Sequence, residues 1–98
     1  MDVAKHRAAA ISRVLDGDGR ASPEQRRAAF DNVGVAEPAR VLIEKVANHA
    51  YEVTDADVAV AKQALTEDEI FELVVCAAIG KASRQLAAVT AAIAEATR

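Results

Sequence analysis

This chain has few of the residues that usually build a reactive or ligand-stacking site. Tryptophan is absent from its 98 residues, and one tyrosine and two phenylalanines are its only aromatic side chains. Platforms on which nucleic-acid bases or sugar rings could stack are therefore scarce. The single cysteine, Cys76, rules out an intrachain disulfide. No Gly-rich phosphate loop and no Gly-x-Ser-x-Gly nucleophile elbow occurs in the sequence.

Long runs of one charge or of apolar residues are also missing. The chain has 12 Lys and Arg against 15 Asp and Glu, a net charge of −3, with both signs interspersed. The closest basic cluster is Arg26-Arg27, for which we expect a solvated helix face. Lys81, Arg84 and Gln85 interrupt the only candidate for a membrane span. We therefore expect a soluble, bacterial-type cytoplasmic protein with neither nucleic acid nor membrane as its partner.

What the chain has in quantity is alanine, which supplies roughly a quarter of its residues. A domain of this length buries only about 60 to 65% of the surface that its unfolded form exposes. Many of its core contacts involve one methyl group, so the stability margin of a monomer is thin. We expect residues 1–98 to form a single helical domain that gains burial by homo-oligomerisation.

Apolar spacing predicts an all-α fold, with about five helices and a long C-terminal one. The first helix is expected from Val3 to Leu15, with an inner face formed by Val3, Ala10, Ile11, Val14 and Leu15. After a glycine-rich break, Ser22-Pro23-Glu24-Gln25 supplies an N-cap, a proline and a capping-box glutamine. The second helix should therefore run from Pro23 to about Asn32.

Three more helices are expected in the second half of the chain. One opens at Glu37-Pro38 and extends to about Glu52, with the buried stripe Leu42, Ile43, Val46, Ala50 and Val53. Thr54 caps a short fourth helix, and Thr66-Glu67-Asp68-Glu69 repeats the capping-box signal. That second signal starts a helix that should continue to about Thr97.

The last helix carries a second apolar pattern. Steps of four and three, as in a coiled-coil seam, separate Val75, Ile79, Ala82, Leu86, Val89, Ile93 and Ala96. One face of this helix therefore requires a partner. Gly80 lies mid-helix, where glycine is less favourable than alanine by about 1 kcal/mol, so we expect another helix to approach closely there. Cys76 lies among Val74, Val75, Ala77 and Ala78, where burial should keep its thiol protonated and inert.

The segment from Glu37 to Glu72 contains a pattern of polar residues with fixed spacing. Glu37 lies twelve residues before His49, which is followed by Tyr51, Glu52 and Ala56, and the helix start Leu65-Thr66-Glu67-Asp68-Glu69-Ile70 closes the pattern. The pattern resembles the alkylhydroperoxidase D-like and carboxymuconolactone decarboxylase family. The resemblance implies that family's helical fold and a cyclic assembly, since the family usually forms trimers and hexamers.

The resemblance does not extend to the family's redox residues. Its alignment places His49 and Glu52 where the two redox cysteines would stand, and Ala56 where a later histidine would stand. Ala64 replaces a glycine, and only Glu37 matches, at the position of the family's proton-relay glutamate. Thiol-based peroxide reduction requires a thiolate and a resolving thiol, so the resemblance implies the scaffold without that chemistry.

The remaining candidates for catalysis are His49, Glu37, Glu52 and Tyr51. Histidine beside carboxylates is a competent general base near neutral pH when a pocket surrounds it. On one continuous helix, His49 and Glu52 would share a face because they are three residues apart. Two such ligands do not make a zinc site, which needs at least a third. We expect no metal and no cofactor.

Three hypotheses about function remain open at this point. The first is a noncatalytic helical oligomer that binds a protein partner or a small-molecule ligand. The second is a cysteine-free enzyme that uses His49 as general acid or base on a small carboxylate or carbonyl substrate. The third, a thiol peroxidase-like antioxidant protein, has only the analogy of fold, and fold does not determine function.

Overall fold

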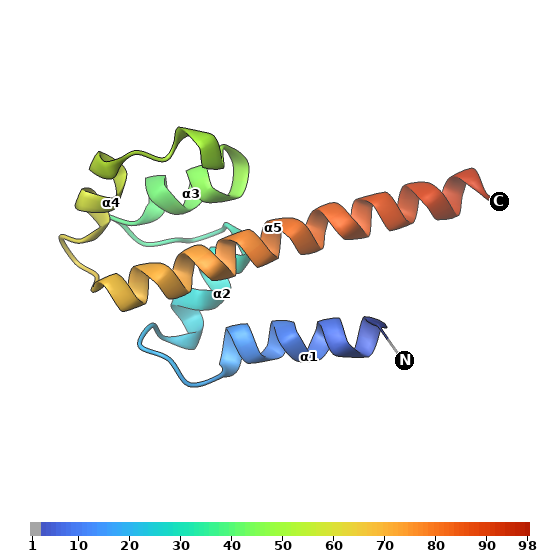
Figure 1. The fold of residues 1–98 in the computed structure, drawn as a ribbon, viewed down its shortest axis with the longest axis horizontal. Helices are drawn as coiled ribbons and strands as arrows, with labels where there is room; N and C mark the ends of the chain where they lie inside the picture. The colour runs from blue at the N-terminus through green and yellow to red at the C-terminus, as the bar shows by residue number, and fades with distance from the viewer. Residues whose placement is uncertain (1–2) are drawn as a thin grey trace.

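The computed structural model describes residues 3–98 and shows an all-helical chain arranged along one long helix (Figure 1). Its elements are α1 (Val3–Asp16), α2 (Pro23–Asp31), α3 (Arg40–Asn48), the 3-10 turn η1 (Ala50–Glu52), α4 (Asp55–Ala61) and α5 (Glu67–Ala96). No strand occurs within residues 3–98. The predicted all-α class and the long C-terminal helix are therefore confirmed, whereas the alkylhydroperoxidase D-like arrangement stays a prediction.

Helix α5 is the spine of the molecule, which measures 50 × 29 × 20 Å. Helix α2 makes the most extensive contact with it, and α3 the next. In Figure 1, α3 and α4 lie on one side of α5, while α1 lies on the other side and runs in the opposite direction. The C-terminal part of α5 extends beyond this body of helices, so the core is confined to the first half of α5.

Three helices begin with the reciprocal hydrogen bonds that the sequence predicts. Ser22, Thr54 and Thr66 each accept the N–H of the residue three positions later, at 3.1, 3.3 and 3.2 Å. The side chains of Gln25, Asp57 and Glu69 accept the backbone N–H groups of the three caps in return, each at 2.9 Å. These bonds satisfy amides that a helix start leaves unpaired, so they determine where α2, α4 and α5 begin.

The third helix is shorter than expected, because it begins at Arg40 instead of Glu37 and ends at Asn48 instead of Glu52. The Glu37-Pro38 peptide is cis and lies in a turn, in which the Ala39 N–H donates to the Ala36 carbonyl at 3.2 Å. At the other end, His49 leaves the helix with φ −149° and ψ 55°. The predicted stripe is buried at Leu42 and Ile43 but ends before Ala50, which is exposed.

The predicted inner face of α1 is wrong over most of its length. Only Leu15 is buried, Ile11 and Val14 are half-buried, and Val3 is 69% exposed. The reason is that the side of α1 that faces α5 borders an open groove, lined in part by Ala10 and Ile11. Amphipathic spacing predicted that this face is buried, and the described part of the chain buries only its C-terminal end.

The core is small and made largely of modest side chains. Ile43 and Cys76 are the largest side chains that are fully buried, and around them pack Ala29, Leu42, Ala61, Leu73 and Ala77. Burial raises the pKa of the Cys76 thiol, and its Sγ lies 3.7 Å from the Val14 carbonyl oxygen. The predicted burial of Cys76 among apolar residues is thus confirmed.

Gly80 allows the C-terminal end of α2 to lie directly against α5. A Cβ atom at this position would overlap the carbonyl oxygen of Phe30. The same oxygen accepts a hydrogen bond from Arg84 Nη1 at 2.5 Å, and Asn32 ends α2 in the left-handed conformation at φ 53°. The close approach expected from a mid-helix glycine is confirmed, and α2 supplies it.

Arg26 and Glu72 anchor the loop between α1 and α2, and the expectation of a solvated Arg26 is wrong. Arg26 is 5% exposed, and its Nη1 donates to the carbonyl oxygens of Gly17 at 2.6 Å and Val14 at 3.4 Å. The carboxylate of Glu72 accepts the N–H groups of Arg20 at 2.8 Å and Ala21 at 2.7 Å. A guanidinium with several donors can satisfy loop carbonyls, which is why an arginine is found inside here.

Substitution of Gly80 by alanine should destabilise the fold, although alanine is the better helix former by about 1 kcal/mol. The added methyl group must displace the end of α2, and overpacking of this kind costs about 1–3 kcal/mol. Chemical denaturation followed by circular dichroism measures the change. Ala87→Gly, at an exposed position of the same helix, is the control for propensity alone. A more stable Gly80→Ala protein would contradict the close contact.

Glu72→Gln should lower the free energy of unfolding at neutral pH by about 1–3 kcal/mol, because a charged acceptor of loop amides is lost. Desolvation acts to raise the pKa of Glu72, but the Ala21 and Arg20 amides and nearby Arg26 outweigh it, so the folded pKa lies below its usual value. The stabilisation is therefore present above the unfolded pKa and is lost as pH falls through the folded pKa.

The pH dependence of denaturation tests this assignment. The difference between wild type and Glu72→Gln should shrink in acid, whereas Asp68→Asn, on the exposed first turn of α5, should show a smaller difference at neutral pH. A deficit of Glu72→Gln that stays constant from neutral pH into strong acid would show that its charge is not the stabilising feature.

Candidate functional site

The predicted site residues His49, Tyr51 and Glu52 lie where α3 gives way to η1. The His49 N–H still donates to the Lys45 carbonyl at 2.6 Å, but the next bond runs from the Glu52 N–H to the His49 carbonyl at 2.8 Å. His49 has the non-helical backbone angles φ −149° and ψ 55°, so His49 and Glu52 do not belong to one α-helix as the spacing predicted. Their separation of three residues therefore no longer implies a shared helical face.

All three side chains face solvent. Tyr51 is 84% exposed, and His49 and Glu52 are also exposed. The His49 and Tyr51 rings make an edge-to-face contact, with centroids 6.2 Å apart and planes at 90°. Within residues 3–98, His49 has no hydrogen bond from its ring to a carboxylate. A general base works best where a pocket holds the substrate and excludes water, and this corner offers a surface instead.

Glu37 lies apart from these residues. Its carboxylate forms an ion pair with Arg40 at 2.8 Å and is 60% exposed. It borders a cavity together with Pro38 and residues of α2, the segment 64–65 and α5, and neither His49 nor Tyr51 nor Glu52 lines that cavity. The structure thus does not bring the four predicted residues into one pocket, and their catalytic role stays a prediction.

The acidic, histidine and cysteine side chains are dispersed over the structure. Within residues 3–98, no group of three or more His, Cys, Asp or Glu side chains lies close enough together to hold a metal ion. A partly buried ion pair between Lys45 and Asp57, at 2.8 Å, joins α3 to α4. The Lys45 ammonium, followed by the Thr54 amide, lowers the pKa of Asp57, which is what a structural contact between two helices requires.

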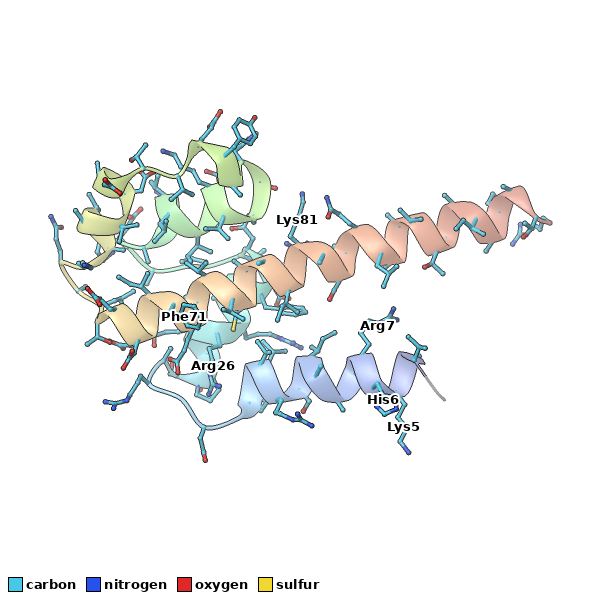
Figure 2. The ribbon with its side chains drawn as sticks, viewed as in Figure 1. Lys5, His6, Arg7, Arg26, Phe71 and Lys81 are labelled. Atoms are coloured by element: carbon cyan, nitrogen blue, oxygen red, sulfur yellow. The ribbon has the colours of Figure 1, made fainter. Side chains whose placement is uncertain are left out.

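An apolar groove without a covering element lies between α1 and α5. Its volume is about 300 Å³, and it is lined by Arg7, Ala10, Ile11, Ile79, Ala82, Ser83 and Leu86. In Figure 2, α1 and the C-terminal part of α5 point their side chains toward this open space, with Arg7 at its outer end. The coiled-coil spacing predicts the wall of the groove that α5 forms. For the other wall, the sequence predicts instead that Ala10 and Ile11 lie on the inner face of α1.

Beyond the groove, the seam of α5 is exposed. Leu86 is 43% exposed, Val89 is 55% exposed and Ile93 is 59% exposed, whereas the buried residues of α5 lie between Ile70 and Gly80. We call the row Leu86, Val89, Ile93 and Ala96 the distal seam. The positions beside this apolar row carry no charge, since they hold Ser83, Gln85 and Thr90.

The expectation that no segment resembles a membrane span is wrong for α5, which is long and apolar enough by length and composition alone. Helix α5 has 30 residues and contains an 18-residue stretch with a mean hydropathy of 1.2. Within the structure, 22% of that stretch is buried. Its many alanines produce this value despite Lys81 and Arg84. A single helix of this kind is weak evidence, since core helices of soluble proteins pass the same test.

Replacement of His49 by alanine should leave the free energy of unfolding unchanged within about 0.5 kcal/mol, because an exposed side chain with few contacts is removed. Ile43→Ala, at a core position of the preceding helix α3, should lose about 2–5 kcal/mol and serves as the reference for a buried position. Urea denaturation of the two variants and wild type makes the comparison. A loss at His49 near that of Ile43 would contradict its exposed placement.

Comparison of the chain with models of protein families, with curated proteins and with solved structures finds no match. The resemblance drawn from Glu37, His49 and the 65–70 helix start therefore stays a prediction. The molecule thus has an exposed apolar face on α5, and its polar candidate residues lie apart from one another.

Proposed function

We propose that this chain is a noncatalytic helical interaction protein that associates with a second copy of itself through the distal seam of α5 and the α1–α5 groove. The observation that carries the proposal is the exposure of Leu86, Val89 and Ile93 along one face of a helix that nothing in residues 3–98 covers. Apolar residues in a regular row on one helix face mark an interaction site more often than scattered ones do.

Helix length supports the same conclusion. At 1.5 Å per residue, the 30 residues of α5 span about 45 Å, and its buried residues end at Gly80. A helical segment that extends beyond the packed part of a domain is marginally stable in water unless its apolar face is packed. A partner along the distal seam would supply that packing, so the helix and its partner stabilise each other.

A second copy of the chain fits this face in pattern and in charge. Ile79, Leu86 and Ile93 occupy one class of heptad position, while Val75, Ala82, Val89 and Ala96 occupy the other. The flanking positions hold Ser83, Gln85, Thr90 and Ala92, so two identical helices meet without like-charge repulsion. A two-fold axis would place the same surface on both subunits, as in most homodimers.

The groove extends this surface onto α1. Ile79, Ala82 and Leu86 belong both to the seam and to the groove, whose other wall contains Ala10 and Ile11. A partner helix lying along the seam would therefore also cover the exposed face of α1. Pairing of two copies would bring two α1 and two α5 helices together as a four-helix arrangement.

Sedimentation equilibrium at micromolar concentration tests the proposal with charge substitutions on two faces of α5. Leu86→Asp and Ile93→Asp should weaken association by at least about a hundredfold, since each buries an aspartate in place of a large apolar side chain in both copies. Ala91→Asp introduces the same charge on the opposite face of the helix and should associate like wild type.

Two outcomes would contradict the proposal. One is a wild-type chain that sediments as a monomer throughout the micromolar range. The other is an oligomer that Leu86→Asp and Ile93→Asp leave intact, which would place the interface elsewhere. Flotation with phosphatidylcholine vesicles distinguishes self-association from membrane binding. A wild-type chain that is monomeric and floats with the vesicles would show that α5 binds a membrane instead of a second copy.

A further inference from the structure

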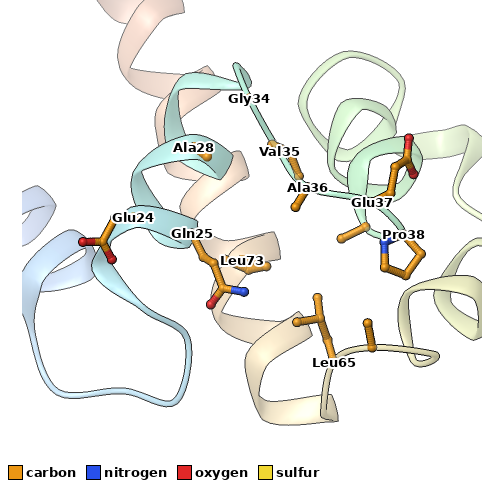
Figure 3. Close-up of a pocket in the computed structure, with 12 residues that line it drawn as sticks. Glu24, Gln25, Ala28, Gly34, Val35, Ala36, Glu37, Pro38, Leu65 and Leu73 are labelled. Carbon is orange, nitrogen blue, oxygen red and sulfur yellow. The ribbon is translucent and has the colours of Figure 1, made fainter.

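A cavity of about 310 Å³ lies at the end of the molecule opposite the distal seam, where α2, the segment 34–39 and the start of α5 meet (Figure 3). Its volume is at the lower end of the range for small-molecule sites, about 300–1,000 Å³. Leu73 and Ala39, each 3% exposed, form buried parts of its lining. Ala28, Val35, Pro38 and Leu65 add apolar wall, so the space suits a compact apolar body.

Gln25 supplies a fixed polar group in this apolar lining. Its Oε1 accepts the Ser22 N–H at 2.9 Å, and its own N–H donates to Ser22 Oγ at 3.1 Å. An oxygen held by a backbone donor determines the orientation of the amide, which leaves Nε2 on the other side. In Figure 3 this nitrogen points toward the side of the cavity where Leu65 lies.

Within residues 3–98, the Gln25 side chain makes one hydrogen bond, through Oε1, so the two N–H donors of Nε2 have no acceptor there. Gln25 is half-buried, so an acceptor brought in by a ligand would replace water there. Ligand sites commonly combine an apolar lining with a few placed polar groups of this kind. The capping box thus serves two purposes: it starts α2 and it aims a donor pair at the cavity.

Charge at the rim narrows the class of ligand. Glu24 and Glu37 border the cavity, and Arg40 pairs with Glu37 at 2.8 Å without lining the cavity itself. In Figure 3 both carboxylates point outward, so they do not offer a partner inside. Arg40 compensates the charge of Glu37, so Glu24 is the carboxylate that would repel an anion at the opening, while Gln25 provides hydrogen-bond donors for a neutral acceptor.

We propose that this cavity binds a small, neutral, largely apolar molecule through a carbonyl or ether oxygen that accepts from Gln25 Nε2. The site is independent of the self-association proposed above, because none of its lining residues belongs to the distal seam or to the α1–α5 groove. Loss of association in Leu86→Asp should therefore leave ligand binding unchanged.

The neutral naphthyl ketone prodan is a suitable probe, since its fluorescence shifts to the blue when it leaves water and its carbonyl can accept from Gln25. Titration of the full chain should show saturable binding. Gln25→Glu keeps an oxygen for the Ser22 amide and removes both donors, so it should weaken binding by about tenfold. Ala28→Leu fills the cavity from α2 and should abolish saturable binding.

Ala59→Leu is the matched control, because it adds the same side chain at an exposed position of α4 outside the cavity. It should bind prodan like wild type, and circular dichroism of each variant verifies the helical fold. If Ala28→Leu does not fold, the prodan affinity of Gln25→Glu relative to wild type tests the proposal by itself. Absence of saturable binding to wild type, or equal affinity of wild type and Gln25→Glu, would overturn the proposal.

Discussion

The end of α2 lies against α5 at Gly80, and this contact determines how much of the long helix the rest of the chain can cover. The Phe30 carbonyl occupies the space where any other residue would place Cβ. Toward the start of α5, the core residues Ile70, Leu73, Cys76 and Ala77 are buried under α2 and α3. Beyond Gly80 no residue of α5 is buried. The contact thus divides α5 into a core half and an exposed half.

The composition explains why the exposed half matters. A core built around alanines, with Ile43 and Cys76 as its largest fully buried side chains, gains little from burial within one chain. Pairing of the distal seam would add the burial that the domain lacks. Chemistry has less support in the structure, since His49 and Tyr51 face solvent and Glu37 lies beside a different cavity. Both proposals therefore concern binding.

Local signals in the sequence predicted local structure well. The capping boxes at Thr54 and Thr66 mark where α4 and α5 begin, and Gly80 marks a close contact, because in each case the physical cause lies within a few residues. Arg26 and His49 could not be placed in this way. Burial of Arg26 depends on a loop that folds back over it, and His49 depends on a helix end without a strong stop signal.

Amide hydrogen exchange of the full chain at low and high concentration tests self-association through α5 most directly, because it locates the contact. The account predicts that amides of residues 86–96 exchange rapidly in dilute protein and become protected as concentration rises, together with those near Ala10 and Ile11. Amides around Leu73 should be protected at both concentrations. Distal α5 amides that stay equally unprotected up to high concentration would contradict the account.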